Sequence, residues 1–285
     1  MNIEMVPYLL LLLAILAGWL TDARVSILFV GIAVAAGLVL GRLMPISVIW
    51  ILTLGLSLWL PTKFQMKGAA RLLFYAVALI LSLAMLSHRL PGFNNLPIYE
   101  NVQFSVDSIP FTMFLNFDQT IAGLLLYLFF IKPRQPTTFG REQILVSLKV
   151  WGALSALIFT IVLSIQYVRF DVKFPELGWI WILNNLFFVC LAEEALFRGF
   201  IQNGISAILP KTKPFAMASI ALASTLFGLA HYQGGVPLIG LATVAGLFFG
   251  YAYDRTKRIE SAIIVHFGLN LIHFVFFSYP ALIAN

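Results

Sequence analysis

The sequence has 285 residues, of which 61% are hydrophobic and only 11% are charged. Soluble domains carry roughly a quarter of charged residues, so this composition excludes a soluble globular protein and indicates a membrane protein. A net charge of +6 can indicate a protein that binds nucleic acid. Here the basic residues lie in short loops between apolar segments, so membrane topology explains them better. We therefore expect a lipid bilayer and no nucleic acid as partner. The single cysteine, Cys190, excludes an internal disulfide and a paired-cysteine metal site.

Apolar windows that approach the 17 to 25 residues needed to span a bilayer follow one another along the chain. Two of them are short, so we predict an all-α, polytopic transmembrane helical bundle with about eight to ten spans. The first window has no Lys or Arg before its apolar core and resembles a spanning helix, not a cleaved signal. The windows cover residues 5–21, 25–41, 46–60, 71–87, 117–132, 143–167, 178–200, 214–232, 236–253 and 260–278.

The basic residues are divided unequally between the two sides of this predicted bundle. By the positive-inside rule the richer side is cytoplasmic, which places both termini outside. The polar stretch 88–116 then lies outside, and its Pro, Gly and Asn content is typical of an irregular loop. The cytoplasmic side has Arg24, Lys63, Lys67, Arg71, Lys132, Arg134, Arg141, Lys211, Lys213, Arg255, Lys257 and Arg258, against Arg42, Arg89, Arg169 and Lys173 outside.

The chain divides near residue 140 into two parts with different expected roles. Residues 1–140 are hydrophobic spans of unassigned role, whereas nearly every intramembrane ionisable group lies in residues 141–285. A charge near the bilayer centre costs about 3 kcal/mol on insertion scales and marks a functional site by default. We therefore expect a catalytic core in residues 141–285, with its motifs within residues 178–275.

The first motif lies in the stretch NNLFFVCLAEEALFRGF, residues 184–200. In a helix, Glu194 and Arg198 are four residues apart on one face and can pair, whereas Glu193 points about 100° away. A carboxyl in apolar surroundings holds a proton more readily than one in water, which suits proton transfer near neutral pH. We therefore expect Glu193 to be the chemically active carboxyl and Arg198 to be the counter-ion of Glu194.

Two further motifs follow, Phe227-x-x-x-His231 and His266-x-x-x-Asn270. In each, four-residue spacing puts both side chains on one helix face. Together with Glu193 they offer a carboxylate, two imidazoles and an amide, which is enough to activate a water molecule and stabilise an oxyanion. We expect Phe227 to pack against the site, because a phenyl ring has no acid–base chemistry.

These three motifs, in this order, resemble the CPBP or Abi family of intramembrane proteases, which includes CAAX prenyl protease 2 and bacteriocin-processing enzymes. The resemblance covers roughly residues 178–275, and GLFFGYAYDRTKRIESAIIVHFGLN is similar to the family's final motif with its preceding glycine-rich helix and basic turn. It implies one pair that activates water, one that stabilises the oxyanion and one that holds the site together. These pairs are Glu193 with His231, His266 with Asn270, and Glu194 with Arg198.

The resemblance leaves the role of a metal open, because the family is described both as metalloproteases and as glutamate-dependent proteases without metal. Glu193, His231 and His266 could supply three zinc ligands and leave a fourth position for water. The sequence has no His-Glu-x-x-His motif, which places two histidines on one helix face in many zinc proteases. We favour water activation without a cofactor.

The predicted function is an intramembrane endopeptidase for membrane-associated or lipid-modified peptides and proteins. We expect a prokaryotic cytoplasmic membrane and a site open toward the cytoplasm. Bacteriocin processing and immunity are among the candidate roles.

A proton-coupled transporter is the main alternative, since buried carboxylates and histidines also form proton relays. The two halves show no repeat of the kind that many transporters have. A non-catalytic membrane scaffold is the third candidate.

Straight spanning helices would keep the two motif histidines apart. At about 1.5 Å per residue, His231 lies roughly 25 Å from the loop near Lys213, but His266 lies only about 10 Å from the loop near Lys257. The two can meet if the hairpin at residues 199–214 projects beyond the membrane or if part of it lies flat at the interface, which requires a break in the helix. Gly199, Gly204 and Pro210 favour such a break, and we predict that it occurs.

Overall fold

The computed structural model describes residues 2–133 and 139–283, and these residues are mostly helical. Among them, eight helices are long and apolar enough to cross a membrane, and Ala23–Val39 and Phe117–Ile131 are shorter apolar helices. The prediction of a helical bundle with about eight to ten spans is confirmed, and the protein is an integral membrane protein. Of the basic residues used to predict its orientation, Arg134 lies outside the described residues.

The described residues form two compact units whose segments alternate along the chain. Unit 1 takes its residues from Met1–Ile98, Met113–Arg134 and Phe187–Leu196. Unit 2 takes its residues from Tyr99–Thr112, Gln135–Leu186 and Phe197–Asn285. The functional division near residue 140 is a different kind of boundary and stays a prediction.

Unit 1 is built around one short buried helix, α5. Every residue of α5 is buried, and α5 contacts α1, α3, α4 and α8. The α1 and α2 helices form a hairpin in which the buried hydroxyl of Ser26 donates to the carbonyl of Ala14 at 2.7 Å. The unit comprises η1 (Ile3–Met5), α1 (Val6–Leu20), α2 (Ala23–Val39), α3 (Pro45–Lys63), α4 (Gly68–Leu86), α5 (Phe117–Leu126), η2 (Tyr127–Ile131) and α8 (Leu191–Glu194).

The contact between α5 and α8 leaves no room for a side chain. A Cβ atom built on Gly123 of α5 would lie 2.4 Å from the Cα and 2.7 Å from the Cβ of Ala192 in α8. Glycine therefore lets the two helices approach backbone to backbone, as small residues do in membrane helix packing. Since α8 also carries Glu193 and Glu194, this contact determines where unit 1 holds both carboxyl groups.

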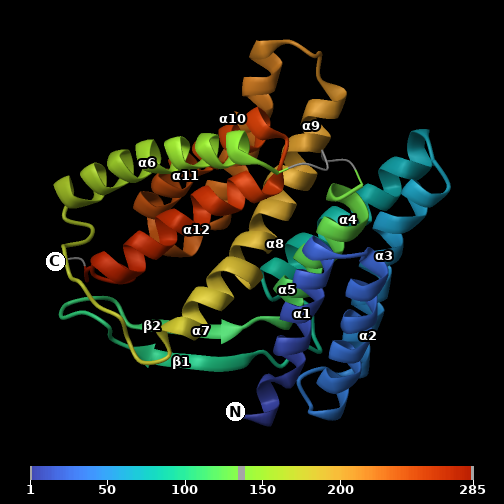
Figure 1. The fold of residues 1–285 in the computed structure, drawn as a ribbon, viewed down its shortest axis with the longest axis horizontal. Coiled ribbons are helices and arrows are strands. Elements are labelled where there is room, and N and C mark those ends of the chain that lie inside the picture. The colour runs from blue at the N-terminus through green and yellow to red at the C-terminus, as the bar shows by residue number, and fades with distance from the viewer. Residues whose placement is uncertain (1, 134–138, 284–285) are drawn as a thin grey trace. The chain divides into compact units, whose positions relative to one another are not determined.

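The long polar connection contains a β-hairpin, so the prediction of an irregular loop throughout residues 88–116 is wrong. Strands β1 (Leu96–Val102) and β2 (Phe111–Leu115) form a two-stranded sheet, drawn as arrows in Figure 1. Their apolar, β-branched and aromatic residues favour strands, whereas the turn-forming Pro, Gly and Asn residues mostly precede β1 or lie between the strands. Turn residues therefore dominate the composition of a stretch that also holds two strands.

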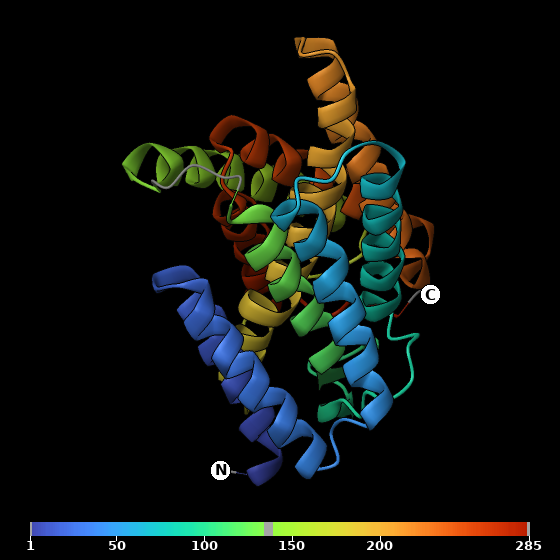
Figure 2. The ribbon, with the colours of Figure 1, turned by 90° about the vertical axis from the view of Figure 1, so that its right-hand side faces the viewer.

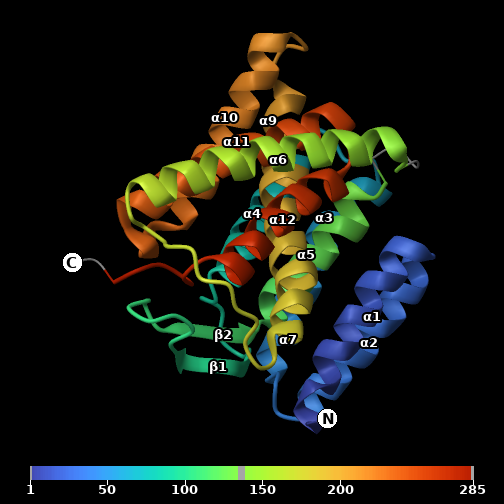
Figure 3. The same cartoon turned by 60° about the vertical axis from the view of Figure 1, so that its left-hand side comes forward.

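Unit 2 is a packed set of long helices. Its α6, α11 and α12 contact one another, and α10 packs along α11, as Figures 1 and 3 show. The helix α11 thus lies between α10 and the α6–α12 pair. The elements of the unit are α6 (Arg141–Ser164), α7 (Gly178–Leu183), α9 (Asn203–Ile208), α10 (Lys213–Ala230), η5 (Tyr232–Gly234), α11 (Gly235–Thr256) and α12 (Ile259–Phe276).

The motif with the two carboxylates lies in one long helical segment, Gly178–Ile208. Two π-helical stretches, η3 (Asn184–Cys190) and η4 (Ala195–Gln202), flank the four α-helical residues of α8. Gly199 and Gly204 lie inside helical structure, so the predicted break at these glycines is wrong. The helix ends before Pro210, in the turn between α9 and α10. Within unit 2 this α9–α10 hairpin projects beyond α6 and α12 (Figure 2).

A single methyl group tests the close approach of α5 and α8. Gly123→Ala forces the two backbones apart, because the new Cβ would lie 2.4 Å from the Cα of Ala192. Overpacking of this kind costs about 1–3 kcal/mol, so we expect a lower Tm in detergent and weaker activity. Gly55→Ala in α3 is the matched control, since its Cβ meets nothing within 4 Å. Equal Tm values for the two variants would contradict the packing argument.

Candidate active site

The two motif histidines of unit 2 meet at the ring of Phe227. The ring centroid of Phe227 lies 4.6 Å from that of His231 and 5.8 Å from that of His266. Phe227 and His231 belong to the C-terminal end of α10, and His266 belongs to α12. Phe227 therefore contacts both imidazoles, and its role beside a catalytic site stays a prediction.

A backbone contact orients the imidazole of His231. Its Nδ1 lies 2.8 Å from the carbonyl oxygen of Phe227. Because a carbonyl oxygen only accepts hydrogen bonds, this contact assigns the proton of the neutral ring to Nδ1 and the basic lone pair to Nε2. The side chain is partly accessible, so Nε2 is a suitable acceptor for a proton from water.

The imidazole of His266 is held by aromatic stacking. It is buried, and its ring lies 4.5 Å from the ring of Phe249 with an interplanar angle of 16°. One turn further along α12, the Nδ2 atom of Asn270 donates to Oδ1 of Asn185 at 3.2 Å. The predicted pair thus lies on α12, where His266 contacts the rings of Phe227 and Phe249 and Asn270 contacts an amide.

Arg198 lies fully buried beneath the same rings. Its guanidinium carbon is 4.5 Å from the ring centroid of Phe227 and 5.2 Å from that of Phe249, and one guanidinium nitrogen donates to the carbonyl of Gly246 at 3.0 Å. A cation over an aromatic face contributes about 0.5–2 kcal/mol, more where water is excluded. Arg198 therefore supports the aromatic cluster in addition to its predicted role beside Glu194.

A second bond repeats this contact one helical turn later. Nε2 of Gln202 donates to the carbonyl of Gly250 at 3.1 Å. A Cβ atom on Gly246 would lie 2.9 Å from the guanidinium of Arg198, and one on Gly250 would lie 2.7 Å from Oε1 of Gln202. The two glycines of α11 thus give two polar side chains access to the helix backbone.

Sequence reasoning missed Asn185, Phe249, Gly246 and Gln202. A signal for two of them was present, because Arg198-x-x-x-Gln202 and Gly246-x-x-x-Gly250 have the same spacing. Small residues four apart mark close helix contacts in membranes, and polar residues four apart on another helix are natural partners. Asn185 and Phe249 have no such pattern, since single polar and aromatic residues are common in apolar helices.

The predicted carboxyl groups belong to the other unit. Glu194 is fully buried and Glu193 is partly buried in α8 of unit 1. They precede Arg198 in the same helical segment, Gly178–Ile208. Unit 2 therefore brings together Arg198, Phe227, His231, His266 and Asn270, while the approach of Glu193 and Glu194 to the imidazoles stays a prediction.

The two histidines outside the motifs, His88 and His273, contact side chains outside the predicted site. In unit 1, Nδ1 of His88 lies 2.8 Å from a carboxylate oxygen of Asp118 at the start of α5, and Asn95 donates to the other oxygen at 3.0 Å. In unit 2, the ring of His273 lies 5.0 Å from that of Tyr279. The contact of His88 thus joins the end of α4 to the start of α5.

The described residues hold no cluster of side chains that could bind a metal ion. Across residues 2–133 and 139–283, no group of three or more His, Cys, Asp and Glu side chains is placed to hold a metal ion. The zinc set Glu193, His231 and His266 stays an alternative, and we derive no catalytic step through a metal. The metal-free mechanism is still a prediction.

The fold and this cluster show which class of protein this is. It is a polytopic membrane protein whose C-terminal helices hold two imidazoles, an amide and a guanidinium. Residues 175–272 match the family model for the type II CAAX prenyl endopeptidase Rce1-like family, and this part of the chain is similar to the domain of that family. The match confirms the family resemblance and covers every predicted site residue. No curated protein and no solved structure matches the chain.

Replacing Arg198 tests whether it supports the cluster. Arg198→Gln removes a charged hydrogen bond worth about 1.5–3 kcal/mol together with the contacts to the rings of Phe227 and Phe249. We expect a clear fall in Tm and in activity, and only partial recovery in Arg198→Lys, because an ammonium group lacks the planar fork of a guanidinium. Lys149→Gln, at an exposed position of α6, is the control. Wild-type behaviour of Arg198→Gln would exclude the supporting role.

Proposed function

We propose that this protein is an intramembrane endopeptidase that hydrolyses peptide bonds of membrane-associated or lipid-modified peptides or proteins. The observation that carries the proposal is the meeting of His231 and His266 at Phe227, within the segment that matches an endopeptidase family. Buried polar groups in apolar helices are costly and are kept where function needs them. A protease domain accounts for both imidazoles and for the amide beside them.

In the proposed mechanism, Glu193 and His231 activate the attacking water. Nε2 of His231 is the available base, because Nδ1 faces the carbonyl of Phe227. As the water oxygen bonds to the scissile carbonyl carbon, its proton passes to this pair, and the same proton later reaches the leaving amine nitrogen. The C–N bond then breaks, and a new carboxyl group and a new amino group are formed.

The proposed oxyanion donors are His266 and Asn270. When water attacks, the carbonyl oxygen gains negative charge, and N–H groups already pointing at it stabilise the transition state. Stacking on Phe249 fixes the ring of His266, and the bond to Asn185 fixes the amide of Asn270. Both donors are thus oriented before the substrate binds, which is where most of their effect originates.

The substrate and setting follow from the membrane location. We propose a prokaryotic cytoplasmic membrane with the site facing the cytoplasm, because basic residues predominate in the loops of one predicted side, which the positive-inside rule places in the cytoplasm. Processing of bacteriocin-like peptides, self-immunity and cleavage of a membrane regulator all agree with this class of substrate. Glu194 and Arg198 then serve as supporting groups.

Proteolysis by the purified full chain tests the proposal. A panel of membrane-anchored peptides in detergent should be cleaved by wild type and by Glu142→Gln, an exposed control on α6, but at least 100-fold more slowly by Glu193→Gln. Cleavage that survives a chelator supports metal-free catalysis, whereas loss that zinc restores would move the mechanism to a metal. Unchanged cleavage by Glu193→Gln would overturn the site assignment, and a wild type that cleaves nothing would favour a transporter or a scaffold.

The amide pair gives a second, separate test. Asn270→Ala should lower kcat by about 10²- to 10³-fold, the usual effect of losing an oxyanion donor, with little change in KM. Asn185→Ala should lower kcat less, because it only positions Asn270 through the 3.2 Å bond between the two amides. In the Asn270→Ala background, Asn185→Ala should add nothing further. Independent, multiplying losses would show that Asn185 acts by another route.

A further inference from the structure

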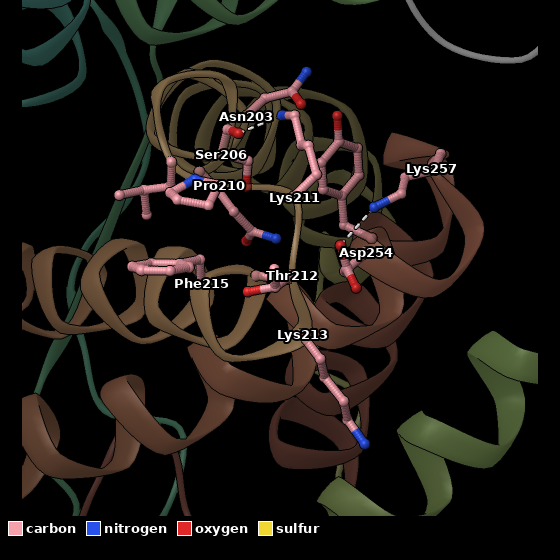
Figure 4. A pocket seen from close by; sticks show the side chains of 13 residues that line it. Asn203, Ser206, Pro210, Lys211, Thr212, Lys213, Phe215, Asp254 and Lys257 are labelled. Carbon is pink, nitrogen blue, oxygen red and sulfur yellow. Dashed lines mark hydrogen bonds and ion pairs between the residues drawn. The ribbon is translucent and has the colours of Figure 1, made fainter.

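A polar hollow lies in unit 2 at the turn between α9 and α10. It has a volume of about 490 Å³ and is bordered by the α9–α10 turn and by the C-terminal end of α11, as Figure 4 shows. None of the predicted catalytic residues lines it. The proposed protease activity therefore leaves this site without a role.

Positive charge predominates in the hollow. Three lysines, Lys211, Lys213 and Lys257, line it together with a single carboxylate, Asp254. Nζ of Lys257 lies 2.5 Å from a carboxylate oxygen of Asp254, and Nζ of Lys211 donates to the carbonyl of Ser206 at 2.5 Å. In Figure 4, Lys211 lies among the lining side chains and Lys257 lies beside Asp254, whereas Lys213 extends away from the other lining side chains. An anion would thus meet two ammonium groups held in place by oxygen partners.

The hollow lies where three predicted membrane spans end. The candidate spans are Gly178–Ile208, Lys213–Ala230 and Tyr232–Thr256, and the lining residues come from the end of the first, the start of the second and the end of the third. The ends of apolar spans mark the interface where the phosphates of lipid headgroups lie. A ligand in the hollow would therefore be at headgroup depth.

The end of α10 adds a weaker positive contribution. The helix begins beside the hollow, and its N-cap residue Thr212 makes no side-chain hydrogen bond to the first turn. A helix N-terminus carries a partial positive charge and favours anions. This contribution accompanies the lysines and would not by itself define a site.

We infer that the hollow binds a phosphate group at the membrane surface, as carried by the headgroup of an anionic phospholipid. Lysine ammonium groups bind phosphate as point charges, and basic pockets at the ends of membrane helices hold anionic headgroups. The volume of the hollow also accommodates the glycerol that follows such a phosphate. This site is independent of the catalytic one, so its test does not depend on proteolysis.

Lipid-dependent thermal stability of the full chain measures this binding. Phosphatidylglycerol in detergent micelles should raise Tm in a saturable way, and phosphatidylcholine should have little effect, because ligands stabilise the folded state that binds them. Each basic residue near an anionic surface strengthens binding roughly fivefold, so Lys211→Gln combined with Lys257→Gln should weaken the apparent affinity by about 25-fold. Lys63→Gln combined with Lys67→Gln removes the same charge on the same predicted side, at exposed positions at the end of α3 and the start of α4, and should leave the affinity unchanged.

A variant that should tighten binding separates loss of the site from unfolding of the protein. Asp254→Asn removes the only carboxylate among the residues that line the hollow and releases Lys257, so it should tighten binding of phosphatidylglycerol. Inorganic phosphate is the second probe: a phosphate response that needs Lys211 and Lys257, without a preference for the lipid, would assign the site to the free ion and reject the headgroup. An unchanged lipid response in the double lysine variant, or weaker binding in Asp254→Asn, would overturn the inference.

Discussion

Two hydrogen bonds from side chains to the backbone of α11 support the arrangement of the C-terminal unit. Arg198 donates to the carbonyl of Gly246, and Gln202 donates to the carbonyl of Gly250. In an apolar medium a buried guanidinium must find acceptors, and helix carbonyls beside glycine are accessible because no Cβ covers them. The rings of Phe227 and Phe249 then close over the guanidinium and in turn hold the two imidazoles. Cation, rings and imidazoles thus form consecutive layers of one cluster.

Much of the candidate site could be predicted from spacing alone. Side chains four apart share a helix face whatever the tertiary structure, which is why Phe227 with His231 and His266 with Asn270 could be paired in advance. That both pairs belong to one site needed the family resemblance, because straight helices would have kept the imidazoles at different depths. In the structure the two imidazoles meet at the ring of Phe227, a contact between helices about which hydropathy carries little information.

Other features have no reliable signal in a single sequence. The strands β1 and β2 are short and lie among turn residues, so composition described the whole connection as a loop. The π-helical stretches η3 and η4 have the same apolar composition as the α-helices around them, and only the hydrogen-bond pattern distinguishes the two. Asn185 is one polar residue in an apolar helix, and its bond to Asn270 depends on how α12 packs. These features depend on contacts between elements distant in the sequence.

The π-helical stretches on either side of Glu193 and Glu194 also bear on how the chain tolerates changes in length. An α-helix that loses one residue rotates everything beyond the deletion by about 100°, which would turn a carboxyl group to another face. A π-helical turn contains one residue more than an α-helical turn, because its bonds run from i to i+5. Removing a residue from Asn184–Cys190 or Ala195–Gln202 would restore α-helical bonding locally and preserve the face that Glu193 occupies. The helix can therefore lose one residue on either side of its two acidic residues without turning them to another face.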